Sequence, residues 1–266
     1  MKAKLGRKRV HVEDMNSIRD GHYAKKQLFC DSRLISWSHR RRLQVGLELA
    51  RKFPGRRVLD YGSGDGAFLA LLMSKPYAPS EAIGGELHRN VVEECEARLG
   101  NSTLHFVLID DLHNSGSFDR IFCMEVLEHV VELQRILDYL ERLLAPEGKL
   151  FISVPVETGL PLILKQTVRR IAGWRGLGDY PGQSSYTIGE YLAAIFAGSR
   201  QRIARPIATE ENGVTFPDHK GFNWMVFRGI LAQRFEIEEV VSSPMTWLSA
   251  HLASQVWFVL RKKPRA

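Results

Sequence analysis

The segment from Val58 to Phe68 constrains the fold of this chain more than any other part of its sequence. It consists of an apolar pair typical of a buried strand, a turn with Gly62, Gly64 and Gly66, and the start of an apolar helix. Glycine leaves no side chain over a ligand and adopts backbone conformations that other residues avoid. The free N–H groups of the helix would point back into the turn. The segment therefore predicts a cradle for a small ligand.

The spacing of the glycines alone leaves the ligand open. Gly62-x-Gly64-x-x-Ala67 also satisfies the dinucleotide-binding pattern with alanine in its last place. Asp60, however, places a carboxylate at the end of the strand, beside the turn. A carboxylate repels a pyrophosphate and attracts an ammonium group. We therefore favour a ligand that carries a methionine-like amino group.

The same segment resembles motif I of the class I S-adenosylmethionine-dependent methyltransferases, in which an acidic residue precedes glycines at alternate positions. Glu86 follows twenty residues after Gly66, at the end of an apolar run, where the family places the acid that holds two ribose hydroxyls. Asp110 follows the apolar run 104–109 and matches the acid that contacts the adenine amino group in the family. These matches occur in the order that the family requires.

Two further segments extend the resemblance. Residues 124–130 match the signature around the fourth strand, and residues 144–150 match the turn into the fifth strand, with Glu147 in place of a usual glycine. The chain is thus similar to the small-molecule members of the family, of the type 11 and type 23 domains. The resemblance implies S-adenosyl-L-methionine as cofactor and the following binding residues: Asp60, Gly62, Ser63, Gly64, Gly66, Glu86, Leu87, Asp110, Asp111, Met124 and Glu125.

Strand-like and helix-like segments alternate from Val58 onward, which predicts an α/β fold with a parallel sheet covered by helices on both faces. The resemblance makes this a Rossmann-like, seven-stranded, mostly parallel sheet whose last strand is antiparallel, closed by segments 235–238 and 255–260. We expect residues 1–54 to form an N-terminal segment and a leading helix, and residues 55–266 to form the methyltransferase domain. In relatives such a leading helix reaches the cofactor carboxylate, which makes Tyr23, Arg33 and residues 39–42 candidates here.

An insertion after the fifth strand distinguishes this chain from its family, in which a short link is usual. Residues 158–217 contain one apolar helical face around Leu160 and Leu164, opposed by basic residues, and a capping box at Thr187-x-x-Glu190 before a second apolar run. The basic residues of this face are Lys165, Arg169, Arg170 and Arg175, next to Trp174. A helical insertion at this edge of the sheet would cover the mouth of the site, so we predict a substrate lid.

Two histidines are the candidates for catalysis. Methyl transfer requires the acceptor to be positioned and water to be excluded, and a base only where a hydroxyl or amine must lose a proton. His129 lies in the fourth-strand signature, and His219 follows the insertion, where relatives line the substrate pocket. We expect His219 to face the acceptor. For His129 a structural or cofactor-side role is the alternative.

The three cysteines are widely spaced and include no Cys-x-x-Cys pair, so we expect neither disulfides nor a metal site. The sequence has no signal-peptide core and no apolar run long enough to span a membrane, which predicts a cytoplasmic protein. The net charge of +7 arises partly from basic ends. With the basic helical face, it also fits peripheral contact with an anionic membrane.

Taken together, the sequence predicts methyl transfer to a small or lipid-linked acceptor, and we favour oxygen as the methylated atom. One alternative is an RNA methyltransferase, supported by the high pI of about 9.4. The chain has no recognisable RNA-binding module and no Asn-Pro-Pro-Tyr-like motif, so we do not expect a nucleic-acid partner. The other alternative is a partner protein that binds S-adenosylmethionine without turnover.

Overall fold

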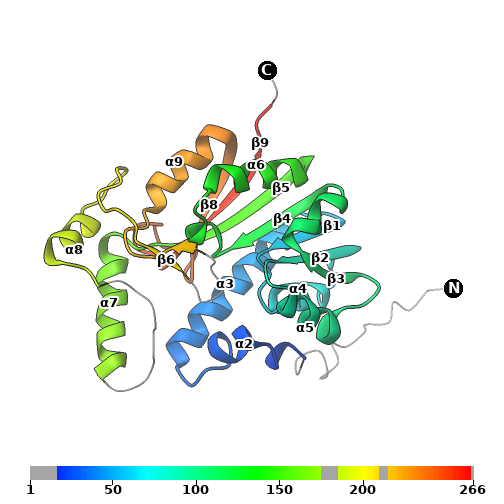
Figure 1. Cartoon of the computed structure of the whole chain (residues 1–266), viewed down its shortest axis with the longest axis horizontal. Coiled ribbons are helices and arrows are strands. Elements are labelled where there is room, and N and C mark those ends of the chain that lie inside the picture. Colours follow the sequence, from blue (N-terminus) through cyan, green and yellow to red (C-terminus); the bar gives the residue numbers. More distant parts are fainter. Residues whose placement is uncertain (1–16, 175–184, 210–214, 265–266) are drawn as a thin grey trace.

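The computed structural model describes residues 17–174, 185–209 and 215–264, and its centre is a seven-stranded sheet (Figure 1). The strand order is β3-β2-β1-β4-β5-β9-β8. The strands are β1 (Arg57–Tyr61), β2 (Glu81–Glu86), β3 (Leu104–Leu108), β4 (Phe118–Met124), β5 (Leu144–Pro155), β8 (Phe235–Ser243) and β9 (Gln255–Lys262). The first five pair in parallel, and β9 runs antiparallel between β5 and β8. The predicted mostly parallel sheet with an antiparallel last strand is therefore confirmed.

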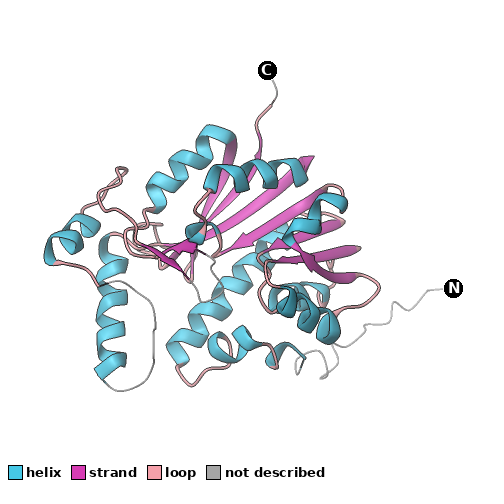
Figure 2. Cartoon of the chain, viewed as in Figure 1, coloured by secondary structure: helices cyan, strands magenta, loops and turns pink. Residues whose placement is uncertain are grey.

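Helices cover both faces of this sheet (Figure 2). They are α2 (His22–Gln27), α3 (Arg33–Lys52), α4 (Ala67–Met73), α5 (Arg89–Leu99), α6 (Leu133–Leu143) and α9 (Trp224–Arg234), with short 3-10 helices η1 (Ile109–Asn114) and η2 (Leu127–His129). Apolar side chains of α6 and α9 form one core with the sheet, and those of α3, α4 and α5 form a second core on the other face. The alternation of elements in the sequence therefore produced the expected layers.

The leading helix α3 begins well before Leu43, Leu47 and Ala50, the apolar residues at helical spacing in its second half. It begins at Arg33 because Ser32 caps it, its hydroxyl accepting a hydrogen bond from the N–H of Ile35. The polar first half of α3 is held by Ser36, whose buried hydroxyl donates to the carbonyl of Leu28 over 2.5 Å. Side-chain bonds of this kind leave no apolar periodicity, so the sequence did not reveal this half of the helix.

Residues 158–217 contain α7 (Gly159–Trp174), α8 (Ile188–Ile195) and a small hairpin of β6 (Ile207–Thr209) and β7 (Thr215–Pro217). The predicted capping box at Thr187 and Glu190 is present. The hairpin was not predicted, because strands of three residues carry too little pattern. The side chains of Arg169, Arg170 and Trp174, and the whole of Arg175, lie outside the described residues.

No helix in the described ranges is long and apolar enough to cross a membrane. The basic residues at the N-terminal end, from Lys2 to Arg9, lie outside these ranges. At the other end, Arg261 forms an ion pair with Glu236, and Lys263 donates to the carbonyl of Gln233. Two basic side chains of the C-terminal end therefore interact with the domain itself.

Arg120 on β4 ties the end of the leading helix to the sheet. Its side chain is buried and donates to the carbonyl oxygens of Ala50, Phe53 and Gly55. Arg120→Met should therefore lower the free energy of unfolding by about 2–3 kcal/mol, since it leaves these carbonyls without a charged donor. Urea unfolding measures this loss. Arg89→Met at the exposed start of α5 is the control, and an equal effect of both changes would contradict the role of Arg120.

Candidate active site

The glycine-rich turn joins β1 to α4 at the carboxyl edge of the parallel strands. Gly62, Gly64 and Gly66 all have positive φ, of 76°, 55° and 72°. The N–H groups of Gly62 and Ser63 both donate to the carbonyl of Gly85 on β2, at 2.8 and 3.1 Å. The turn is thus fixed against the neighbouring strand. Its conformation requires glycine, as the sequence predicted, because L side chains are strained in this region of φ.

Position 62 also has no room for a side chain. A methyl group there would lie 2.4 Å from Cγ2 of Val126, which follows β4. Gly62→Ala should therefore introduce strain of about 1–3 kcal/mol and weaken S-adenosylhomocysteine binding by about tenfold. Calorimetry measures the affinity. Gly189→Ala on α8, where nothing lies within 4 Å of the added atom, is the matched control and should not weaken binding. Unchanged affinity of Gly62→Ala would contradict a rigid cradle.

Asp60 at the end of β1 is the most unusual acid of this edge. It is 1 % exposed, and neither carboxylate oxygen has a hydrogen-bond partner in the described part of the chain. Burial, with the nearby charge of Glu86, raises the pKa of Asp60 to about 8, although Arg42 opposes the rise. A buried carboxyl without a partner is costly to the fold, which indicates that its partner is a ligand.

The acids of the next two strands take different positions. Glu86 at the end of β2 accepts hydrogen bonds from the N–H of Gly64 at 2.9 Å and from that of Leu87 at 2.7 Å, so it lies directly against the glycine turn. Leu87 is half exposed beside it. Asp110 and Asp111 lie on η1, just after β3, and are exposed. The structure thus places all of them at the carboxyl edge, with Glu86 in contact with the cradle.

Glu125 follows Met124 at the end of β4 in a left-handed conformation, with φ of 55°. Its carboxylate accepts hydrogen bonds from the hydroxyl of Ser153 at 3.1 Å and from the amide of Gln255 at 3.4 Å. Arg42 of α3 lies 3.8 Å from its Oε2. Positive φ in a residue other than glycine persists where the surroundings enforce it, often at functional sites. Of the N-terminal candidates, the structure brings Arg42 into this cluster.

The sequence did not reveal how the N-terminal segment is attached to the cradle. Asp65, in the glycine turn, accepts a hydrogen bond from the N–H of Ala24 at 2.6 Å. Arg98 of α5 reinforces this attachment by donating to the carbonyls of Ser17 and Asp65. The ring of Tyr23 consequently lies beside Gly64, 3.3 Å from where a Cβ would be. The segment therefore borders the ligand cradle.

The two predicted catalytic histidines meet although they are ninety residues apart in the sequence. The rings of His129 and His219 lie edge to face with centroids 4.5 Å apart. Burial lowers the pKa of His129, whose ring also makes a hydrogen bond to the backbone of Pro217. Because proline has no backbone N–H, the imidazole is the donor in this bond. The insertion thus orients His129.

Glu128 lies beside the two histidines and is fully buried. Neither of its carboxylate oxygens has a hydrogen-bond partner among the described residues, and Oε1 lies 3.9 Å from Nε2 of His129. Burial raises the pKa of Glu128 well above its usual range. Arg205 of the insertion donates to the backbone carbonyl of Glu128 and to that of Asp218. The role of Arg205 was not predicted, because nothing in its sequence context marks it.

The described residues fit S-adenosylmethionine. Within the described residues the carboxylate of Asp60 is left for an ammonium group, and the turn packs so closely that a Cβ on Gly62 or Gly66 would collide with neighbouring side chains. Glu86 lies against the same turn, where its carboxylate accepts from the N–H of Gly64. The three features come from β1, β2 and the turn between β1 and α4, which meet at one edge of the sheet, as expected for an open α/β fold.

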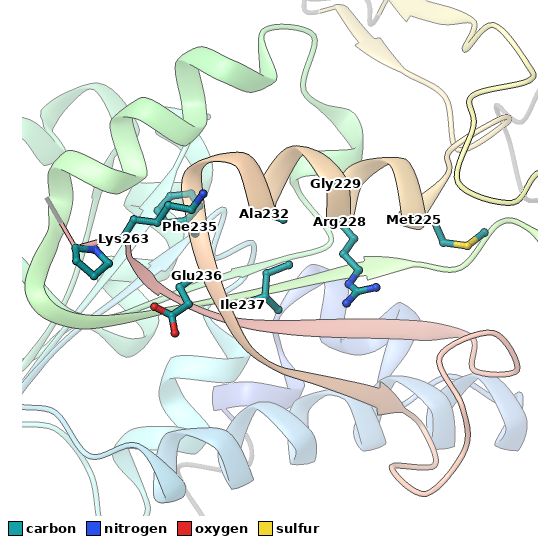
Figure 3. Close-up of a pocket in the computed structure, with 9 residues that line it drawn as sticks. Met225, Arg228, Gly229, Ala232, Phe235, Glu236, Ile237 and Lys263 are labelled. Carbon is teal, nitrogen blue, oxygen red and sulfur yellow. The ribbon is translucent and has the colours of Figure 1, made fainter. Parts of the chain in front are cut away.

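A separate groove lies beside α9, away from the carboxyl ends of the parallel strands (Figure 3). It has a volume of about 900 Å³ and lies between α9 and the start of β8, with Met225, Arg228, Glu236 and Ile237 in its wall. Because β8 runs parallel to β5, the start of β8 lies at the amino edge of the parallel strands. None of the predicted cofactor residues lines this groove, so it is not part of the candidate site.

Comparison with known proteins agrees with this geometry. Residues 36–199 match the family model described as "Methyltransferase domain" (Methyltransf_23). The ubiquinone biosynthesis O-methyltransferase of Xanthomonas oryzae pv. oryzae is 37% identical over 105 residues, which cover 37% of this chain and 43% of that protein. The enzyme of the same name from Mesorhizobium japonicum is 30% identical over 132 residues, covering 46% and 51%. The match therefore spans about half the length of these curated relatives or less.

Solved structures show the same fold at low sequence identity. Magnesium protoporphyrin IX methyltransferase from Synechocystis PCC 6803, with bound S-adenosylhomocysteine, has a TM-score of 0.52 at 18% identity and covers 94% of both chains. The CurJ carbon methyltransferase has a TM-score of 0.54 at 18% identity, covering 91% of this chain and 58% of that one. Since the family model spans well over half of the sequence, the chain belongs to the class I S-adenosylmethionine-dependent methyltransferases, in the Methyltransferase domain family.

Proposed function

We propose that this protein transfers a methyl group to an oxygen atom of a small or lipid-linked acceptor. The observation that carries the proposal is the buried carboxylate of Asp60 beside the glycine cradle, which has no hydrogen-bond partner among the described residues. The partial similarity to ubiquinone biosynthesis O-methyltransferases supports oxygen as the acceptor atom. S-adenosylmethionine would supply an electrophilic methyl group on its sulfonium.

On the cofactor side, this chain's residues bind and orient. Asp60 would bind the amino group, and its charge would be stabilised once an ammonium lies against it. Glu86 would exchange its hydrogen bond to the N–H of Gly64 for ribose hydroxyls, and Asp110 and Asp111 would border the adenine. Met124 and Glu125 close the edge at the end of β4. Holding the methyl carbon in line with the attacking oxygen accounts for most of the catalysis expected of such a site.

On the acceptor side, His129 and His219 face each other where the insertion joins the domain. We propose that His219 accepts or orients the proton of the acceptor hydroxyl, and that His129, held by Pro217, supports it. Residues 158–217 would exclude water as a lid over this point. Arg205 and Phe216 from the insertion contact Glu128 and His129, which ties the lid directly to the histidine pair.

The lid also presents apolar side chains that fit a lipid-linked acceptor. Leu160 and Leu164 on α7 are 62% and 67% exposed, and Ile188, at the start of α8, is 83% exposed. Contact with the surface of a membrane would bury these side chains. Sedimentation with phosphatidylglycerol vesicles tests this part of the proposal: the chain should sediment with them, and Leu160→Ser with Leu164→Ser should release it. Equal behaviour of both chains would contradict membrane contact.

The test of the proposed function has two stages. Calorimetry should show binding of S-adenosylmethionine and S-adenosylhomocysteine, and no comparable binding of NAD. Incubation with S-adenosylmethionine and a lipid extract, followed by mass spectrometry, should then show a product heavier by one methylene group. Tight NAD binding would overturn the cofactor assignment. Cofactor binding without any methylated product from lipid or small-molecule extracts would favour a non-catalytic binding protein, and methylated RNA would overturn the acceptor class.

A further inference from the structure

The cluster of Glu128, His129 and His219 has the composition of a metal site. Their donor atoms, one carboxylate oxygen and two imidazole nitrogens, all lie within 4.8 Å of one another. Ligands of a tetrahedral zinc ion are roughly 3.4 Å apart, because each lies about 2.0–2.2 Å from the ion. Small side-chain rotations would therefore close the cluster around one ion. The cysteine pattern could not reveal such a site, since no cysteine takes part.

A second observation separates this cluster from an ordinary group of polar residues. Glu128 is 0 % exposed, and both of its carboxylate oxygens lack a hydrogen-bond partner within the described ranges. A fully buried carboxylate is otherwise paired with a charge or coordinates a metal. Arg205 donates to the backbone carbonyl of Glu128 and not to its carboxylate. The side chain of Glu128 thus remains directed at the histidines.

The surroundings of His129 resemble those of a metal ligand. A ligating histidine usually donates its other ring N–H to a carbonyl or carboxylate, which fixes the tautomer and the orientation of the ring. The hydrogen bond from the His129 ring to the Pro217 carbonyl supplies this contact. His219 belongs to the segment that follows the insertion, so the three ligands come from two distant parts of the chain.

We propose that Glu128, His129 and His219 bind one divalent transition-metal ion, with zinc as the reference ion, and that this ion binds the hydroxyl oxygen of the acceptor. Two histidines and one carboxylate with an open position are the ligand set of several catalytic zinc sites. The ion would lower the pKa of the acceptor hydroxyl, so the proton passes to water, and His219 holds the ion instead of accepting the proton. The oxygen then forms a bond to the methyl carbon as the carbon–sulfur bond breaks and the sulfonium becomes a thioether.

This inference rests on the proposed function for its chemistry, but metal binding itself is tested without turnover. The full chain is treated with a chelator, dialysed, incubated with zinc chloride and analysed by elemental mass spectrometry. Cobalt(II) serves as a second probe, because its visible absorption reports coordination. We expect one zinc ion per chain and a cobalt spectrum in the wild type. His105→Ala, which changes a half-exposed histidine paired with Glu96 on another face, should keep both.

His219→Ala should lower zinc affinity by more than about 100-fold, since even loss of a partner that only supports a ligand costs 10- to 100-fold. Glu128→Gln keeps the volume of a fully buried side chain and should fold, yet it should lose the cobalt spectrum. If the wild type binds no more zinc or cobalt than these two variants, the metal site is refuted. S-adenosylhomocysteine binding to metal-free protein, measured separately, shows whether the proposed function survives that result.

Discussion

Asp60→Asn should weaken the binding of S-adenosylhomocysteine by about 10- to 100-fold at pH 8, because it removes a charge-assisted hydrogen bond of about 1.5–3 kcal/mol. The amide keeps the size of the carboxyl, so the cradle and its glycines should remain in place. Calorimetry measures the affinity. Asp119→Asn serves as a control. Asp119 lies at the start of β4, at the other end of the parallel strands, and accepts hydrogen bonds from the N–H groups of Arg56 and Arg57. Equal affinities of wild type and Asp60→Asn would remove the physical basis for the ammonium assignment.

The same substitution should change the pH dependence of binding. The pKa of Asp60 is raised to about 8 in the ligand-free chain, so the carboxyl is mostly protonated at pH 6 and 7. An ammonium ligand requires the ionised form, and affinity should therefore rise with pH between 6 and 8, by at most about tenfold per pH unit. Asp60→Asn should bind with no such dependence. A flat profile in the wild type would show that Asp60 is already ionised before binding.

Folding stability should respond in the opposite direction. Because the pKa of Asp60 is about 8 when folded against 3.8 for an ordinary aspartate, the folded chain holds a proton that the unfolded chain releases between these values. The stability of the ligand-free protein should therefore decrease as pH rises from about 4 to 8. Asp60→Asn should remove this contribution and raise the melting temperature at pH 8. A residue that destabilises the free fold and strengthens ligand binding is typical of a functional site.

Sequence reasoning could place the predicted cofactor residues at one edge of the sheet because each of them follows a strand in the sequence. Asp60, the three glycines and Glu86 lie at the ends of consecutive strands, and parallel strands bring such ends to one edge. The alternation of strands and helices likewise predicted the parallel sheet, whereas its antiparallel last strand was predicted from the family resemblance. An apolar run followed by an acid or by glycines was enough to predict a strand and the residues at its end. Each such pattern can be recognised within about ten residues of sequence.

The contact between His129 and His219, which we propose to face the acceptor, could not be predicted in this way. The meeting of His129 with His219 depends on how the insertion folds back onto η2, and the β6–β7 hairpin that directs it has strands of only three residues. Arg42 and Arg205 enter the site from a leading helix and from a loop, where arginine is ordinarily a solvated residue. Their roles follow from contacts with Glu125 and Glu128, which only the folded chain displays.

His219→Asn should lower turnover by about 10²- to 10⁴-fold while leaving the affinity for S-adenosylhomocysteine within about threefold, because we propose that its ring contacts the acceptor and not the cofactor. The asparagine retains a polar side chain of similar reach, so the loop before α9 should keep its structure. His105→Asn is the matched control and should keep full turnover. Near-normal turnover of His219→Asn would leave positioning alone to explain the reaction.

Two roles of His219 would explain this loss of turnover, and treatment with a chelator distinguishes them. If His219 acts as a base, removing metal ions should leave the wild type far more active than His219→Asn, since the imidazole still accepts the proton. If His219 instead holds an ion with Glu128 and His129, the chelated wild type should fall to the level of the variant, and added zinc should restore only the wild type. Because Glu128 is buried, lies within 4.8 Å of a nitrogen of both histidines and has no hydrogen-bond partner in the described chain, we expect the second result.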